Sequence, residues 1–266
     1  MKRLLIMKKE LLGAVLALAV GLQANAQTQE QVPVPPPMVP GMTEFWEPQV
    51  PVVTPGKPSA NAILSAPSDA IVLFDGKDLQ KWRNKDGNAA GWTVNNGVFT
   101  VKKGTGDIFT REEFNDFQLH IEWMVPSNIT GKSQARGNSG IFMQGIYELQ
   151  VLDNYNNRTY SNGQAGSIYK QGPPLKNAMR PPGDWNVYDV IYTAPRFKED
   201  STLFSPARIT VLHNGVLIQN NTTITGNTPY IGLPKYKFHG KGPISLQDHG
   251  DPSEPLSFRN IWIRPL

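Results

Sequence analysis

Residues 136–154 read RGNSGIFMQGIYELQVLDN, two strand-like runs joined at Gly145. Side chains two residues apart lie on the same face of a strand. One face of the first run therefore carries Arg136, Asn138, Phe142 and Gln144. One face of the second run carries Glu148 and Gln150, and its opposite face carries Tyr147, Leu149 and Val151. A face that only meets solvent more often holds Lys, Thr and Ser, so these side chains indicate a site that grips a hydroxyl-rich ligand. An ordinary solvated sheet face is the alternative.

Short strands separated by turn residues extend on both sides of this stretch. Asn96-Gly97 and Asn214-Gly215 lie between apolar runs and predict two-residue hairpins, because type I′ turns need positive φ at both central positions. Further strands are predicted at 70–74, 92–94, 98–101, 117–123, 187–192, 208–212, 216–219, 244–247 and 258–263. Many short strands with few helical patterns predict an all-β protein of two packed antiparallel sheets. The residues expected between the sheets are Leu119, Ile121, Trp123, Leu149 and Val151.

The N-terminus predicts an exported protein. Residues 1–26 combine basic residues, an apolar run and the small-residue site Ala24-Asn25-Ala26, which is typical of a signal peptide cleaved after about Ala26. The run is short for a membrane span, so a signal anchor is the weaker alternative and the mature chain is expected to be periplasmic with no span. Residues 27–66 form a Pro-rich arm, expected to be mobile over 27–42 and to lie against the domain from about Thr43. Residues 67–266 form the domain.

Charge and cysteine content narrow the function. The formal charge is +4, and the leader holds Lys2, Arg3, Lys8 and Lys9 against Glu10, so the remaining chain is nearly neutral. A neutral surface does not favour nucleic acid or anionic membrane, and a small neutral ligand fits better. The chain has no cysteine, which excludes a disulfide framework.

A few polar side chains are candidates for chemistry. His249 closes a predicted strand at Asp248-His249-Gly250, a place where loops present functional groups, whereas His213 precedes a turn and is expected at the surface. His120 and Glu122 share a strand face and are expected to form a polar pair. Lys170 precedes a proline pair, and we expect it to project from a loop into the same cleft as Arg136, Glu148 and His249. Trp185 could stack on a sugar ring.

Six segments carry a family resemblance. They read PSDAIVLFDGKDL (67–79), RGNSGI (136–141), YELQVLDN (147–154), SIYKQ (167–171), LQDHG (246–250) and FRNIWI (258–263). In this order they resemble the 3-keto-disaccharide hydrolase domain family, over about residues 45–266. The resemblance implies a concanavalin A-like, laminin G-like jelly-roll sandwich with a saccharide cleft on its concave face. It also implies an exported protein of bacterial glycan utilisation that acts on 3-keto-glycosides, with a partner sugar 3-oxidoreductase making the ketone.

The chemistry of such a substrate defines roles for these residues. A ketone at C3 acidifies the C2 proton, so a base can remove it, the enediolate can expel the C1 aglycone, and water can add afterwards. The sequence leaves Glu148 and His249 as alternative bases. Arg136, Lys170 or a divalent cation held by Glu148, Asp153 and His249 are alternative stabilisers of the enediolate. Substrate contacts are expected from Asn138, Gln144, Gln150, Asp153, Asn154, Trp185, Gln247 and Asp248.

Two other classes of function are open from the sequence. A non-catalytic carbohydrate-binding module would keep the cleft without needing the base. A conventional retaining glycosidase would need two closely spaced carboxylates, and the spacing of Glu148 and Asp153 lacks that arrangement.

Overall fold

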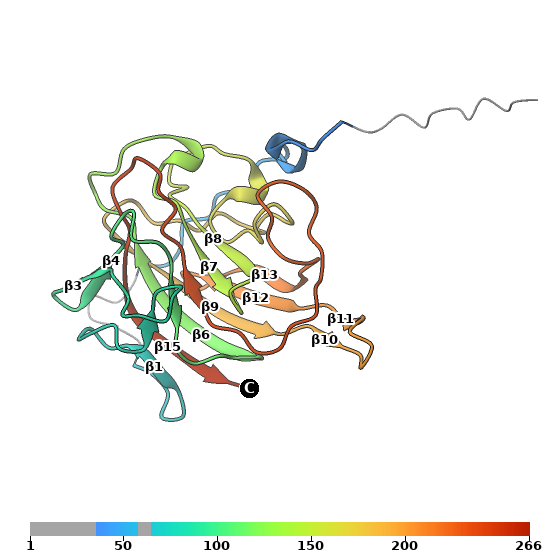
Figure 1. Cartoon of the computed structure of the whole chain (residues 1–266). Coiled ribbons are helices and arrows are strands. Elements are labelled where there is room, and N and C mark those ends of the chain that lie inside the picture. The colour runs from blue at the N-terminus through green and yellow to red at the C-terminus, as the bar shows by residue number, and fades with distance from the viewer. Residues whose placement is uncertain (1–35, 58–64) are drawn as a thin grey trace, which may run out of the picture. The chain divides into compact units, whose positions relative to one another are not determined.

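Two antiparallel β-sheets packed face to face make up the domain (Figure 1). The computed structural model describes residues 36–57 and 65–266, so the predicted leader and residues 27–35 and 58–64 of the arm lie outside the described residues. One sheet has the strand order β13-β12-β9-β6-β15-β4-β3 with β1 paired to β15, and the other has the order β2-β5-β14-β7-β8. The predicted all-β sandwich of jelly-roll type is confirmed.

The bounds of the strands and 3-10 helices follow the chain. The eight-stranded sheet contains β1 (Ile71–Phe74), β3 (Thr93–Asn95), β4 (Val98–Thr100), β6 (Phe117–Met124), β9 (Trp185–Thr193), β12 (Arg208–His213), β13 (Val216–Thr223) and β15 (Ser257–Pro265). The five-stranded sheet contains β2 (Trp82–Arg83), β5 (Ile108–Thr110), β7 (Ser139–Met143), β8 (Tyr147–Val151) and β14 (Ser245–Leu246). A separate hairpin joins β10 (Arg196–Phe197) and β11 (Leu203–Ser205), and the short helices are η1 (Pro40–Thr43), η2 (Ser133–Ala135) and η3 (Ser161–Gly163).

Local turn chemistry fixes two of the hairpins. Asn96 and Gly97 have φ of 49° and 80° between β3 and β4, and Asn214 and Gly215 have φ of 53° and 80° between β12 and β13. Positive φ at both central residues matches the right-handed twist of the flanking strands. Both predicted hairpins are confirmed.

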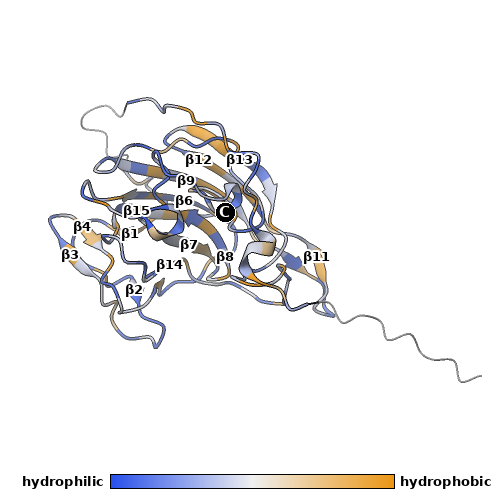
Figure 2. Cartoon of the chain, turned by 90° about the horizontal axis from the view of Figure 1, so that it is seen from above, coloured by the Kyte–Doolittle hydropathy of each residue, from blue (hydrophilic) through white to orange (hydrophobic). Residues whose placement is uncertain are grey.

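The core lies between the two sheets. Leu119, Ile121 and Trp123 of β6 and Leu149 and Val151 of β8 are all fully buried, as the alternation predicts. Figure 2 shows hydrophobic and polar residues alternating along the strands. Burying each of these side chains contributes roughly 1.5–3 kcal/mol to the hydrophobic stabilisation of the fold.

Strand β8 ends the five-stranded sheet and is covered on its free edge by a loop. Gly166 N donates to the Gln150 carbonyl at 2.9 Å, Gln150 N donates to the Ser167 carbonyl at 3.0 Å, and Tyr169 N donates to the Glu148 carbonyl at 3.2 Å. This pairing satisfies backbone groups that an edge strand otherwise exposes. As a result every residue of β8 is buried, including those on its polar face.

The described part of the arm packs on the domain. Residues Met38–Leu266 form one compact unit. Phe45 N donates to Asn162 Oδ1 at 2.9 Å, and Val53 N donates to the Asn177 carbonyl at 2.9 Å. Within the described residues, no helix has the length and apolarity that a membrane crossing requires.

Candidate active site

A cavity of about 360 Å³ opens over the polar face of β7 and β8. Five of the predicted site residues line it, namely Asn138, Glu148, Gln150, Gln247 and His249, together with Phe142, Tyr169, Thr228 and Tyr230. The strand register explains the gathering, because Phe142 pairs with Glu148 and Gly140 pairs with Gln150 across the two strands. Residues paired in this way lie on the same face of a sheet.

Glu148 is the buried carboxyl of this cavity, with 5% of its surface exposed. Burial, together with the negative charge of Asp107, raises the pKa of Glu148 to about 8. Gly140 makes room for the carboxyl, because a Cβ there would lie 2.7 Å from Glu148 Oε1. With its amide nitrogen turned toward Glu148, Gln150 donates to the same oxygen at 2.9 Å. A carboxyl poised near neutral pH in a cavity is the arrangement that general acid–base catalysis needs.

His249 borders the cavity from the strand end after β14. Its side chain is 36% exposed, and its Nδ1 lies 3.4 Å from Asp251 Oδ2. Burial opposes ionisation of Asp251, but hydrogen bonds from His249 and Ser253 outweigh it and lower the pKa of Asp251. Asp251 therefore orients the His249 imidazole at the edge of the cavity.

Two further polar groups of the cavity are available to a ligand. The Gln247 side-chain oxygen is buried and has no hydrogen-bond partner among the residues that the structure describes. The Tyr169 hydroxyl lies 2.7 Å from the Tyr160 hydroxyl, and burial raises the pKa of Tyr169 to about 12. Tyr169 is thus protonated at neutral pH and can act as a proton donor.

Lys170 and Arg136 do not line the cavity. Lys170 Nζ instead donates to the Pro40 and Tyr230 carbonyls, each at 3.0 Å. Arg136 Nε lies 2.7 Å from Asp153 Oδ2, whose side chain is fully buried. Gly137, with a φ of 61°, interrupts the strand alternation between Arg136 and β7, and this turns the arginine away from the predicted face.

Five residues predicted to contact substrate also lie elsewhere. Gln144 has a φ of 53°, which takes it out of the strand alternation, and its Oε1 accepts from the Tyr192 hydroxyl at 2.8 Å. Trp185 starts β9 and stacks on the Arg259 guanidinium at 4.1 Å. The remaining three residues are also held by other partners. Asp153 forms the ion pair with Arg136, and Asp248 accepts a hydrogen bond from Gly106 N. Asn154 accepts a hydrogen bond from Ala165 N.

The two other histidines singled out in the sequence take part in structure. The expected surface position of His213 is wrong, because it is fully buried and stacks on Trp123 with ring centroids 5.7 Å apart. The alternation of β12 places His213 on the same buried face as Ile209 and Val211, and its Nε2 lies 3.1 Å from Asn186 Oδ1 of β9. The predicted pair of His120 and Glu122 is present, with Nε2 and Oε1 3.6 Å apart.

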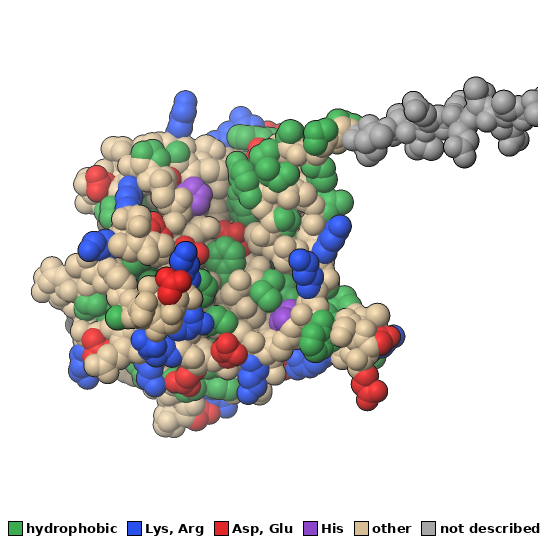
Figure 3. Space-filling model, in the orientation of Figure 1, with side chains coloured by type: hydrophobic (Ala, Val, Ile, Leu, Met, Phe, Trp, Pro, Cys, Tyr) green, Lys and Arg blue, Asp and Glu red, His purple; other side chains and the backbone are tan. Residues whose placement is uncertain are grey.

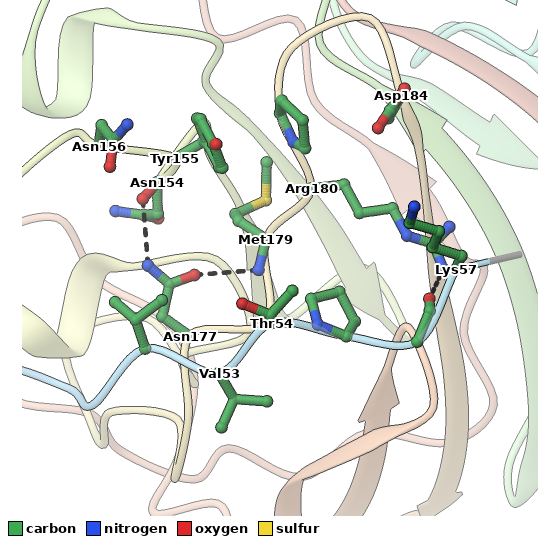
Figure 4. A pocket seen from close by; sticks show the side chains of 14 residues that line it. Val53, Thr54, Lys57, Asn154, Tyr155, Asn156, Asn177, Met179, Arg180 and Asp184 are labelled. Atoms are coloured by element: carbon green, nitrogen blue, oxygen red, sulfur yellow. Dashed lines mark hydrogen bonds between the residues drawn. The ribbon is translucent and has the colours of Figure 1, made fainter.

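A second cavity of about 330 Å³ lies between arm residues 52–57 and residues 177–184 (Figure 4). Asn154 lines this cavity and not the first. The Arg180 guanidinium, which also lines this second cavity, donates to the Gly56 carbonyl at 3.1 Å and to the Trp185 carbonyl at 2.8 Å. The carboxylate that lines it, Asp184, is exposed, whereas the cavity over β7 and β8 holds the buried carboxyl of Glu148 and is the better candidate for chemistry.

The predicted cation ligands are not brought together. Asp153 pairs with Arg136, whereas Glu148 and His249 line the cavity. Over residues 36–57 and 65–266, no group of three or more His, Cys, Asp or Glu side chains has an arrangement that could hold a metal ion.

Several residues of the site have no signal in the sequence. Thr228 and Tyr230 come from a loop without periodicity, and Glu148 N donates to Thr228 Oγ1 at 3.0 Å. Asp107 follows a glycine-rich turn, and its Oδ1 accepts from Asp248 N at 2.8 Å. Tyr169 belongs to the segment that the family resemblance singles out, which is the one clue to its position.

Comparison with known proteins finds a matching family model, a named relative and similar solved structures. The model of a family described as a 3-keto-alpha-glucoside-1,2-lyase-like domain matches residues 69–264. A protein of Bacteroides thetaiotaomicron named 3-keto-disaccharide hydrolase is 30% identical over 248 residues, which cover 76% of this chain and 81% of that protein. A crystal structure of a putative glycosyl hydrolase from Parabacteroides distasonis is 66% identical, with a TM-score of 0.77 over 85% of this chain and 95% of the other. A second structure from that organism, 21% identical with a TM-score of 0.52 over 74% of this chain and 94% of the other, shares the fold.

Proposed function

The chain belongs to the 3-keto-alpha-glucoside-1,2-lyase-like family and is an enzyme of the glycoside hydrolase type, and from its cavity we propose that it cleaves 3-keto-glycosides. The observation that carries the proposal is the buried carboxyl of Glu148 with its pKa of about 8. A carboxylate of this basicity removes a carbon-bound proton better than an ordinary one, and the C2 proton beside a ketone is such a proton.

The proposed reaction has two balanced stages. The Glu148 carboxylate takes the C2 proton, the electrons of the C–H bond form the enediolate, and the C1–O bond breaks as a C1–C2 double bond forms. The leaving oxygen receives a proton, so the aglycone departs as an alcohol. Water then adds across the double bond and the sum is hydrolysis. No oxocarbenium ion is required.

Three side chains take the three tasks of this reaction. Glu148 is the base at C2. The side chain of His249, whose Nδ1 lies 3.4 Å from Asp251 Oδ2, stabilises negative charge on the C3 oxygen. Tyr169, whose pKa of about 12 keeps its proton at neutral pH, supplies the proton to the leaving oxygen and is itself hydrogen-bonded to Tyr160. Arg136 and Lys170 take no part in the bond changes, since they do not line the cavity.

Substrate supply and location complete the proposal. A 3-keto-glycoside arises when an oxidoreductase removes hydride from C3 of a glycoside, so a sugar 3-oxidoreductase is the partner reaction. The features of residues 1–26 support export to the periplasm with cleavage after about Ala26. Residues 27–66 would then form an arm ahead of the catalytic domain at 67–266.

The decisive experiment compares 3-keto-glycosides with their unoxidised parents. We expect sugar release from the ketones alone, and Glu148→Gln and His249→Asn should lower turnover by about 10²-fold or more with the fold intact. Deuterium at C2 should exchange with solvent or slow the reaction. Retention of the label at full rate, or cleavage of the unoxidised parents, would refute elimination and indicate a direct glycosidase; binding without cleavage would indicate a binding module.

A further inference from the structure

Tyr230 presents an exposed aromatic ring at the edge of the cavity. The residue is 64% exposed and lines the cavity next to Tyr169 and Thr228. Ile231 and Leu233 follow it and are 51% and 63% exposed. Figure 3 shows hydrophobic side chains gathered along one side of a hollow in this face. Exposed apolar side chains that continue a ligand cavity indicate a contact surface for part of the ligand.

A buried lysine fixes this ring from behind. Lys170 Nζ lies 4.6 Å from the centroid of the Tyr230 ring and donates to the Tyr230 carbonyl at 3.0 Å. The same ammonium donates to the Pro40 carbonyl at 3.0 Å and lies 3.6 Å from Glu44 Oε1. Its side chain is 3% exposed. One cation thus ties the arm, its own loop and the Tyr230 loop together, and the ring is held in place before a ligand arrives.

The positions of Glu148 and His249 decide which part of the substrate meets this ring. Across the sheet the order is β14, β7 and β8, so the His249 side and the Tyr169–Tyr230 side lie on opposite sides of Glu148. In a sugar ring C1 and C3 flank C2 on opposite sides. With the base at C2 and His249 at the C3 oxygen, the C1 substituent faces Tyr169 and Tyr230.

We infer that Tyr230 is the stacking platform for the leaving group and that the enzyme prefers 3-keto-glycosides whose leaving group is a ring. This inference rests on the proposed function. A fixed aromatic ring contacts the apolar face of a sugar, cyclohexyl or aryl group, whereas a methyl leaving group covers little of it. Lys170 is a positioning residue in this account, because it touches the ring and its loop and not the reacting atoms.

The test uses cyclohexyl and methyl 3-keto-glucosides of one anomer, whose leaving alcohols have similar basicity. Tyr230→Ala should lower kcat/KM for the cyclohexyl substrate roughly tenfold relative to the methyl substrate, mainly through KM. Lys170→Met, which keeps the length of the stem, should move the same ratio in the same direction. Phe204→Ala is the control, since Phe204 is 72% exposed on β11 and does not line the cavity.

The outcomes separate this inference from the proposed function. An unchanged ratio in Tyr230→Ala, with the methyl substrate still cleaved, overturns the platform and leaves the proposed function standing. If the wild type cleaves neither ketone, the proposed function fails. The binding constants of the two glucosides to the wild type and Tyr230→Ala then decide the platform, which requires weaker binding of the cyclohexyl compound alone. If Lys170→Met does not fold, the Tyr230 ratio decides.

Discussion

Replacing Glu148 by glutamine should stabilise the fold while abolishing turnover. The unfolded carboxyl ionises near pH 4.5, and the folded one near 8. A folded pKa above the unfolded value means that stability is complete below pH 4.5 and is lost as the pH rises toward 8. At pH 7, which is about 2.5 pH units above the unfolded pKa of 4.5, the folded state has lost about 3 kcal/mol of unfolding free energy, since each pKa unit corresponds to about 1.4 kcal/mol. A glutamine at this position would carry no such penalty because its amide does not ionise.

Denaturant unfolding at pH 5 and pH 7 measures this effect. We expect Glu148→Gln to exceed the wild type by about 3 kcal/mol at pH 7 and by less than about 1 kcal/mol at pH 5. Glu122→Gln is the matched control with the opposite sign: burial also opposes its ionisation, but His120, Asn260 and Arg259 outweigh it and lower the pKa of Glu122. A Glu148→Gln protein no more stable than the wild type at pH 7 would refute a buried, mostly neutral Glu148.

Further measurements test the pH profile and two of the histidines. The pH profile of kcat/KM should rise about tenfold per pH unit up to a midpoint near 8, the pKa of Glu148. Asp107→Asn should lower that midpoint by less than half of the difference between 8 and the ordinary pKa of 4.5, because burial raises the pKa of Glu148 more than the charge of Asp107 does. A flat profile from pH 6 to 9 would contradict this assignment. Asp189 and Glu122 outweigh burial and raise the pKa of His120 to about 9, so its contribution is complete below pH 6.5 and lost as the pH approaches 9. The destabilisation by His120→Gln should therefore be up to about 3 kcal/mol smaller at pH 9 than at pH 6, and equal values would argue against a charged His120. His213→Asn should lower the unfolding free energy by about 2 kcal/mol through lost ring packing, seen as a lower Tm.

The sequence by itself determined the strands and the polar face that carries Glu148. Alternation between Tyr147 and Val151 assigns Leu149 to the core and Glu148 to the opposite face, because successive side chains of a strand point in opposite directions. The Asn-Gly pairs fix two hairpins through their own φ preferences. Both effects act within a few residues, so they can be seen in a sequence without knowledge of the rest of the chain.

Only the tertiary structure decided which polar residues meet. The strand alternation predicted the wrong face for Arg136 and Gln144, because positive φ at Gly137 and at Gln144 itself breaks the period of two. The residue types around these positions do not indicate this break. The pKa of Glu148 is raised by burial and, to a smaller extent, by the charge of Asp107. Asp107 and the ring of Tyr230 come from segments far away in the chain. Distances between such segments depend on how the sheets and loops pack, and the pKa of a carboxyl depends on those distances and on the water that the packing excludes.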